Sequence, residues 1–180
     1  KVLDLLAEEQ VDFIGAKEGQ TGYSVVLDSI EHDRTILTFK GANNTLKITD
    51  LDLEKFDARW FYSSSLTGES LFALQSLVNL AVEKGIRVAF NPSNYQAKKG
   101  YDALKSIVDK CSVLVMNKEE AELLFDHTTR PDFFPYYIQE HMDKYIVITD
   151  GSQGAHCFYK NKMYSITPNP NSTVVETTGA

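Results

Sequence analysis

The chain has 180 residues, of which 43% are hydrophobic and 24% charged, a balance typical of a folded domain rather than a disordered segment. Its net charge of −7 argues against nucleic acid and anionic membranes as main partners. No apolar run approaches the length of a membrane span, and acids follow the first apolar residues too soon for a signal peptide. We therefore expect a cytoplasmic protein. Cys111 and Cys157 lie far apart and favour neither a zinc site nor a disulfide framework.

The first fifth of the chain predicts a helix, a strand and a hairpin. A helical pattern runs to about residue 9, and a short apolar run over 11–14 predicts a strand. Residues 22–30 and 35–39 are rich in β-forming residues and flank a polar turn. They predict an antiparallel hairpin that extends over about residues 21–41.

From residue 52 onward, short apolar strands alternate with helical patterns. This alternation predicts βαβ units and therefore an α/β fold, with a mainly parallel sheet covered by helices on both faces. In such a sheet, ligands bind beyond the carboxyl ends of the strands. Two further strands, 155–159 and 163–166, predict an antiparallel pair near the end. The alternating strands are 59–62, 86–90, 112–116 and 145–149, and the helices are 69–84, 101–110, 118–125 and 136–142.

Four short polar motifs each follow a predicted strand. Residues 91–94 read Asn-Pro-Ser-Asn, and an ordinary exit from the sheet accounts for them equally well. Residues 117–120 read Asn-Lys-Glu-Glu, in which Asn117 and Glu120 have the spacing of a helix capping box. The alternative is that this pair holds hydrated Mg²⁺ and phosphates, because oxygen ligands suit that ion.

The other two motifs contain glycines next to small residues. Residues 149–154 read Thr-Asp-Gly-Ser-Gln-Gly, which is either a plain turn into the next strand or a turn that a nucleotide approaches closely. Residues 177–180 read Thr-Thr-Gly-Ala, which is either a free terminus or an anion hole for a transferring phosphoryl group.

The order of these motifs resembles that of the ribokinase-like, or phosphofructokinase-B, family of carbohydrate kinases. Further upstream, the Thr-Gly pair at 21–22, Arg34 and the Gly-Ala-Asn run at 41–43 are also similar to that family. The resemblance implies a hairpin lid over the substrate, which is often a dimer contact. It implies ATP and Mg²⁺ as cofactors, and it allows a monovalent cation such as K⁺.

The resemblance also implies a role for each matching residue. Arg34, Gly41, Ala42 and Asn43 match positions beside the substrate. Asn117 matches a nucleotide-binding position and Glu120 a metal-binding one. The nucleotide-binding turn is matched by Thr149, Gly151 and Gly154, and the anion hole by Gly179 and Ala180.

Some positions depart from the family pattern. Glu176 replaces an Asp, which bears on the monovalent-cation site, and Asn91 stands where the family often has Asp. The chain ends before the final Gly-Asp of the last motif, whose Asp is the family's catalytic base, and it lacks the family's first strand. We therefore expect a fragment of one kinase domain that is inactive by itself.

The sequence predicts an ATP-dependent kinase that phosphorylates a carbohydrate hydroxyl. A nucleoside kinase of the same family, or a non-catalytic sugar or nucleotide sensor on the same fold, stays open as an alternative. A dinucleotide-binding domain is disfavoured, because no Gly-x-Gly-x-x-Gly motif follows a strand. The expected partners are a small sugar or nucleoside and a second copy bound through the hairpin.

Overall fold

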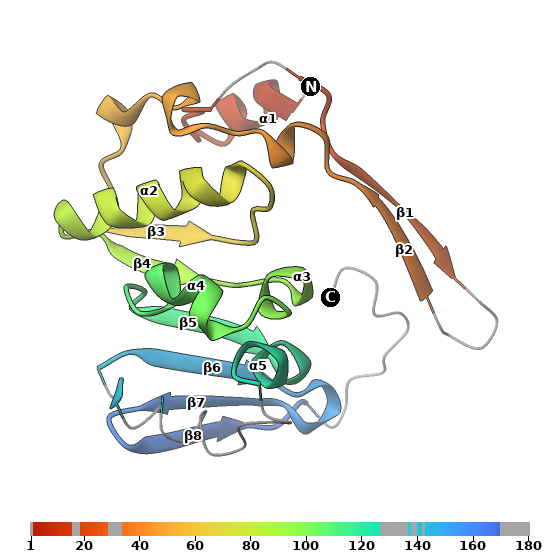
Figure 1. Cartoon of the computed structure of the whole chain (residues 1–180), viewed down its shortest axis with the longest axis vertical. Coiled ribbons are helices and arrows are strands. Elements are labelled where there is room, and N and C mark those ends of the chain that lie inside the picture. Colours follow the sequence, from red (N-terminus) through yellow and green to blue (C-terminus); the bar gives the residue numbers. More distant parts are fainter. Residues whose placement is uncertain are drawn as a thin grey trace. The chain divides into compact units, whose positions relative to one another are not determined.

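The computed structural model describes residues 2–15, 19–28, 34–126, 137, 140–141 and 143–169. It divides into two compact units, Lys1–Phe61 with Leu66–Ile86, and Tyr62–Ser65 with Arg87–Ala180 (Figure 1). Among the described residues, no helix has the length and apolar character needed to cross a membrane. Most of the helix predicted over 136–142 and the whole motif at 177–180 lie outside the described residues.

The first unit begins with helix α1, Val2–Glu8, where the sequence predicted it. The strand predicted over 11–14 is wrong, because these residues form no ladder. Among the described residues, this stretch makes one backbone hydrogen bond to a residue far away in the sequence. In it, the Ile14 carbonyl accepts from the amide of Asp52 at 3.1 Å. An apolar run predicts a strand only where a neighbouring strand is present to pair with it.

The predicted hairpin is formed by β1, Tyr23–Asp28, and β2, Arg34–Phe39. The strands are antiparallel over their full length, with Tyr23 opposite Phe39 and Asp28 opposite Arg34. Because side chains alternate between the faces of a strand, this register separates a strongly apolar face from a mixed one. The hairpin forms a two-stranded sheet of its own.

Three short 3-10 helices follow, η1 (Gly41–Asn44), η2 (Ile48–Asp50) and η3 (Leu53–Lys55). The sequence has no period there, so none was predicted. Helix α2, Ser70–Glu83, matches its prediction. Hydrogen bonds connect its start to this segment: the Leu46 amide donates to the Ser70 hydroxyl at 2.8 Å, and the Glu69 amide to the Asn44 carbonyl at 2.9 Å. The buried apolar residues of α2 are Ala73, Leu74, Leu77, Val78 and Ala81.

The second unit is built on the main sheet, whose strand order is β3-β4-β5-β6-β7-β8. The pairs β4–β5 and β5–β6 are parallel and the pair β7–β8 is antiparallel, as the sequence predicted. The pair β6–β7 is also antiparallel. The strands are β3 (Trp60–Ser63), β4 (Arg87–Phe90), β5 (Val113–Asn117), β6 (Tyr145–Thr149), β7 (Ala155–Tyr159) and β8 (Lys162–Ile166).

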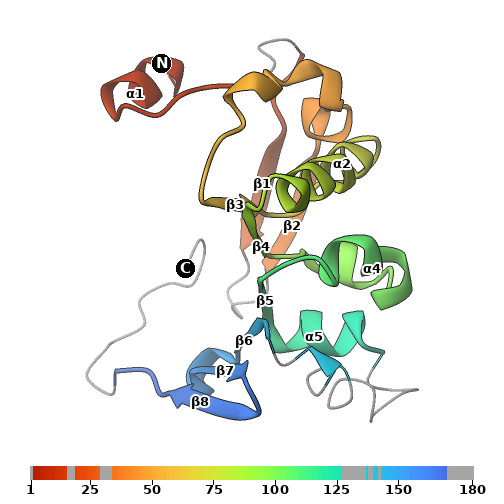
Figure 2. The ribbon, with the colours of Figure 1, turned by 90° about the vertical axis from the view of Figure 1, so that its left-hand side faces the viewer.

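Helices α4 (Tyr101–Val108) and α5 (Lys118–Leu124) lie on the same face of this sheet (Figure 2). A short helix α3, Asn94–Ala97, was not predicted. In β4, β5 and β6, alternate residues are buried and the residues between them are half-buried or exposed. Strand β7 is half-buried throughout, and β8 is exposed throughout. In the described part of the chain, only the central strands β4 to β6 therefore have a fully buried face. The buried strand residues are Val88, Phe90, Leu114, Met116, Ile146 and Ile148.

Candidate functional site

The carboxyl ends of β5 and β6 form a pocket where the sequence predicted nucleotide binding. The two strands are parallel and in register, so Asn117 lies opposite Thr149. Both residues line an open pocket of about 340 Å³, together with Gly151. Three of the four predicted nucleotide-binding residues are thus neighbours. The remaining lining residues are charged: Lys118, Glu119, Glu122 and Asp150.

Asn117 and Glu120 form a complete capping box at the start of α5. The Asn117 side-chain oxygen accepts from the Glu120 amide at 2.8 Å, and the Glu120 carboxylate accepts from the Asn117 amide at 3.0 Å. Burial raises the pKa of Glu120. The bond from the Asn117 amide occupies one oxygen of the Glu120 carboxylate. Glu120 is not among the residues that line the pocket, but it holds the first turn of α5 beside it.

The two glycines of the turn after β6 have different surroundings. Gly151 has a φ of +48° with open space where a side chain would begin. Gly154 has a φ of +94°, and a side chain there would collide with the Ile166 carbonyl of β8. Its own carbonyl accepts from the Asp150 amide at 2.8 Å. The packing of strands thus requires glycine at 154, whereas the pocket leaves Gly151 exposed to an incoming ligand.

Polar side chains connect the loops that follow β4, β5 and β6. The Lys118 amine lies 3.2 Å from the Asp150 carboxylate, and the Asn94 amide group donates to Glu119 at 2.8 Å. The Asn91 side chain donates to the Val115 carbonyl at 2.8 Å and so joins the residue after β4 to the middle of β5. Sequence reasoning did not single out Lys118, Glu119 or Asp150. The available signal was that Lys118 and Asp150 each follow the last residue of a parallel strand.

The predicted substrate residues lie in the first unit, in and beside η1. Gly41 has a φ of +52°, and a side chain there would collide with the Gln20 carbonyl. That carbonyl accepts from the Ala42 amide at 2.9 Å. Asn43 follows in the same turn. Arg34 starts β2 at the other end of the strand, roughly 17 Å from Phe39 by the usual rise per residue, so the structure does not place it beside Gly41.

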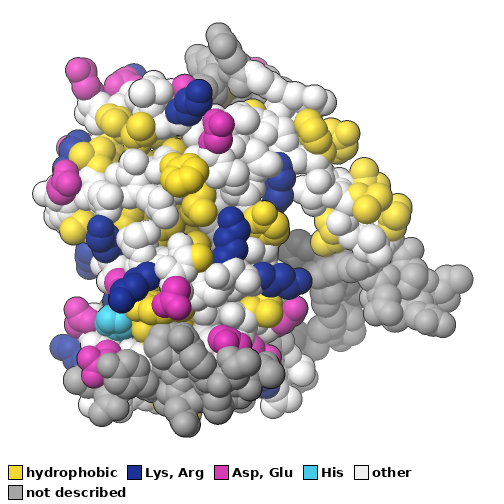
Figure 3. Space-filling model, in the orientation of Figure 1, with side chains coloured by type: hydrophobic (Ala, Val, Ile, Leu, Met, Phe, Trp, Pro, Cys, Tyr) yellow, Lys and Arg dark blue, Asp and Glu magenta, His cyan; other side chains and the backbone are white. Residues whose placement is uncertain are grey.

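The hairpin exposes an apolar face. Tyr23 and Phe39 have ring centroids 5.4 Å apart, and the cross-strand pair of Val25 with Leu37 continues their face. Figure 3 shows hydrophobic side chains gathered on this hairpin. Each of these four side chains is more than two-fifths exposed. A two-stranded sheet is marginal without packing on one face, so this apolar face is suited to contact a ligand or a partner.

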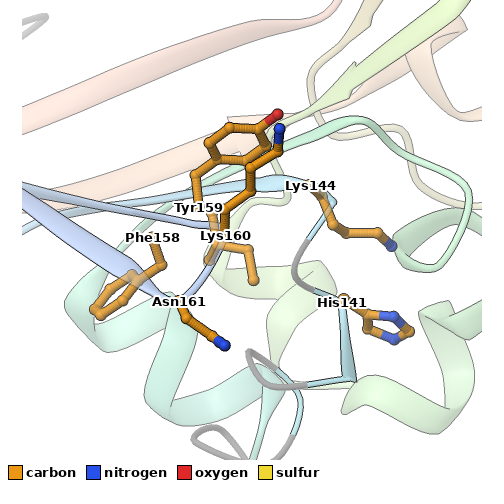
Figure 4. Close-up of a pocket in the computed structure, with 7 residues that line it drawn as sticks. His141, Lys144, Phe158, Tyr159, Lys160 and Asn161 are labelled. Carbon is orange, nitrogen blue, oxygen red and sulfur yellow. The ribbon is translucent and has the colours of Figure 1, made fainter.

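At the opposite end of β6, a second hollow is too narrow to admit a water molecule. Lys144 and His141 line it together with the turn between β7 and β8, and the Lys144 and Lys160 side chains point away from each other (Figure 4). The Lys144 amine is buried, and it donates to carbonyls at the end of α4. This hollow therefore has no room for a ligand.

The predicted anion hole, Gly179 with Ala180, lies outside the described residues, as do Glu176 and the rest of residues 170–180. The described residues contain no group of three or more side chains that could hold a metal ion.

Two comparisons of the sequence with known proteins agree. The profile of a family described as pfkB family carbohydrate kinase matches residues 1–180. A protein of Archaeoglobus fulgidus called an uncharacterized sugar kinase is 28% identical over 175 residues, which are 94% of this chain and 67% of that protein.

Solved structures share the fold. Adenosine kinase from Sinorhizobium meliloti superposes with a TM-score of 0.77 at 16% identity, over 98% of this chain and 57% of that one. Ribokinase from Giardia lamblia gives 0.74 at 16% identity, over 97% of this chain and 57% of that one. The predicted ribokinase-like fold is thus confirmed. This chain spans less than two thirds of the length of either structure.

Proposed function

This chain belongs to the pfkB family of carbohydrate kinases, and we propose that its protein transfers the γ-phosphate of ATP to a hydroxyl of a sugar. The observation that carries the proposal is the pocket at the carboxyl edge of the sheet. There, Asn117 and Gly151, from two separate motifs, line one space beside Thr149. An open space at this edge is where a parallel α/β sheet binds its ligand.

In this proposal the described residues position the nucleotide. Thr149 presents a hydroxyl and Asn117 an amide group to the phosphates, and the bare backbone at Gly151 allows close approach. The Mg²⁺ that accompanies the nucleotide would offset phosphate charge. Glu120 suits an indirect hold on that ion through water, because the Asn117 amide occupies one of its oxygens.

By resemblance to the family, the base that accepts the proton of the attacking hydroxyl is the Asp that comes after the positions of Gly179 and Ala180 in the family motif. These two residues would supply backbone amides near the migrating group. The substrate is assigned to the segment of Gly41, Ala42 and Asn43. The rate would come mainly from positioning and electrostatic stabilisation, and closure of the hairpin would exclude water.

A nucleoside is the second candidate substrate. The paired rings of Tyr23 and Phe39 favour it, since a flat base can stack on an exposed aromatic pair. The same apolar face also suits contact with a second copy of the chain, and we include a homodimer through the hairpin in the proposal. Replacing Leu37 by Lys would then convert a dimer to a monomer in light scattering.

The full-length protein tests the proposal. It is incubated with Mg²⁺, ATP and, in turn, hexoses, ribose, keto-deoxy sugars and nucleosides, while ADP release is followed. We expect one class to stimulate ADP release and to gain a phosphate. Binding of a sugar or nucleoside without phosphate transfer to any of them would instead identify a sensor.

Glu120→Gln separates the metal role from the cap. Glutamine can still accept from the Asn117 amide, so we expect unchanged thermal unfolding. Loss of the carboxylate charge should raise the Mg²⁺ concentration needed for half-maximal rate several-fold. An unchanged Mg²⁺ dependence would reduce Glu120 to a helix cap.

A further inference from the structure

The ion pair between Lys118 and Asp150 joins the two loops that line the pocket. Lys118 is the first residue of α5 and Asp150 follows β6, and their charged groups lie 3.2 Å apart. The lysine side chain is 60% exposed and the aspartate 27%. The lysine is therefore the more exposed partner, and the aspartate is the more buried one.

Lys118 is the basic side chain in a pocket lining whose other charged side chains are acidic, so it is the charged group there that can attract an anion. The lining holds three carboxylates, those of Glu119, Glu122 and Asp150, against one basic side chain, Lys118. The Glu119 carboxylate is held by the Asn94 side chain at 2.8 Å. A polyphosphate entering this space meets a negative field, and only Lys118 among the lining residues can counter it.

An exchange of partners by Lys118 has little energetic cost. Exposed ion pairs contribute little to stability, whereas a lysine bound to a phosphate makes a stronger charge-assisted hydrogen bond. The lysine stem has four rotatable bonds and can turn from Asp150 into the pocket that both residues line.

We infer that Lys118 is a nucleotide-positioning residue that leaves Asp150 and binds a phosphate oxygen when the nucleotide enters, so that Asp150 and the nucleotide compete for it. The inference rests on the proposed function, since it takes the pocket as the nucleotide site. The competing interpretation is a latch, in which the ion pair only holds the two loops together. The two interpretations predict opposite effects of removing Asp150. A latch fails when either partner is lost, whereas competition ends when the aspartate is lost.

The test measures binding rather than turnover. Isothermal calorimetry on the full-length protein compares ADP with adenosine, for wild type, Lys118→Met, Lys118→Arg and Asp150→Asn. Lys160→Met serves as the matched control. Lys160 is an exposed lysine in the turn between β7 and β8, and it does not line the pocket. Thermal unfolding of each variant verifies the fold.

We expect Lys118→Met to weaken ADP binding about tenfold, the size of one charge-assisted hydrogen bond, and to leave adenosine binding unchanged. Lys118→Arg should restore most of the loss, and Asp150→Asn should bind ADP at least as tightly as wild type. Lys160→Met should match wild type.

Each contrary result has its own meaning. If Asp150→Asn loses ADP affinity as strongly as Lys118→Met, the pair is a latch and the inference is wrong. If Lys118→Met binds ADP normally, the inference is also wrong, but nucleotide binding by the protein stands. If the wild type binds neither ADP nor ATP, the proposed function fails and the inference fails with it.

Discussion

A lysine lies near each end of strand β6, but the surroundings of the two lysines differ. At the amino end, Lys144 is 5% exposed and donates to the carbonyls of Val108 at 2.9 Å and Asp109 at 2.7 Å and to the Tyr137 hydroxyl at 3.3 Å. At the carboxyl end, Lys118 is mostly exposed and pairs with the Asp150 carboxylate at 3.2 Å. The buried lysine satisfies the last carbonyls of α4 and so fixes the fold, while the exposed one can change partners.

The same contrast holds for the groups around each lysine. Tyr137 packs against Phe125 at 4.8 Å between ring centroids, and the Tyr101 hydroxyl donates to the Asp109 carboxylate at 2.8 Å. The carboxyl end instead has an open pocket. The amino end of β6 thus stabilises the fold, and we propose that the carboxyl end binds the ligand. This division predicts where substitutions affect folding and where they affect ligands.

The largest expected effect comes from Lys144→Met. Methionine keeps the apolar stem but cannot donate to the buried carbonyl of Val108 or to the partly buried carbonyl of Asp109. We expect the free energy of unfolding to fall by about 3 kcal/mol in urea titrations. Lys160→Met should change it by less than about 0.5 kcal/mol. Equal stability of the two variants would contradict the structural role of Lys144.

A pair of glycine substitutions divides the carboxyl end itself. Gly154→Ala should cost roughly 2–3 kcal/mol, because the methyl group meets the Ile166 carbonyl and the backbone is near a region that only glycine adopts. Gly151→Ala should cost about 1 kcal/mol, for its positive φ alone. Urea unfolding of both proteins measures the difference, and the reverse order would show that the turn is held differently.

The smallest effect is pH-dependent and belongs to the amino end. Burial, and then the charge of Lys144, lowers the pKa of His141. As pH falls, His141 is therefore protonated in the unfolded chain before it is protonated in the folded protein. The contribution of neutral His141 to stability is present above about pH 6.5 and is lost as pH falls below that value. The acids that oppose this shift are Asp109, Glu140 and Asp143.

His141→Gln isolates that contribution. We expect the loss of unfolding free energy between pH 7 and pH 5 to be smaller in the variant than in wild type. The difference should be below that of either glycine substitution, since the ring is partly exposed. Identical pH profiles would show that burial and the charge of Lys144 do not lower the pKa of His141.

The sequence predicted the second unit better than the first. Its strands are continuous apolar runs, and its helices α4 and α5 have a clear period, so short-range pattern sufficed. The segment of η1 to η3 has no such period, and the run at 11–14 lacks a partner strand. Both failures concern elements whose structure depends on tertiary contacts rather than on local sequence.

For the site, the sequence located Asn117 and Thr149 because parallel strands in register bring their carboxyl ends together. It could not show that Lys118 reaches Asp150, since 32 residues separate them and only the register of β5 and β6 makes them neighbours. Nor could it identify Lys144. Nothing in the sequence distinguishes this lysine, which becomes a buried donor because it packs against the end of α4.

Backbone amide NMR of the protein titrated with Mg²⁺ and ADP tests the central claim most directly. The account predicts that the amide signals of Asn117, Lys118, Asp150 and Gly151 shift with ADP and saturate together, while the signal of Lys144 stays in place. Shifts confined to the Lys144 end of β6, or no shifts at saturating ADP, would contradict it.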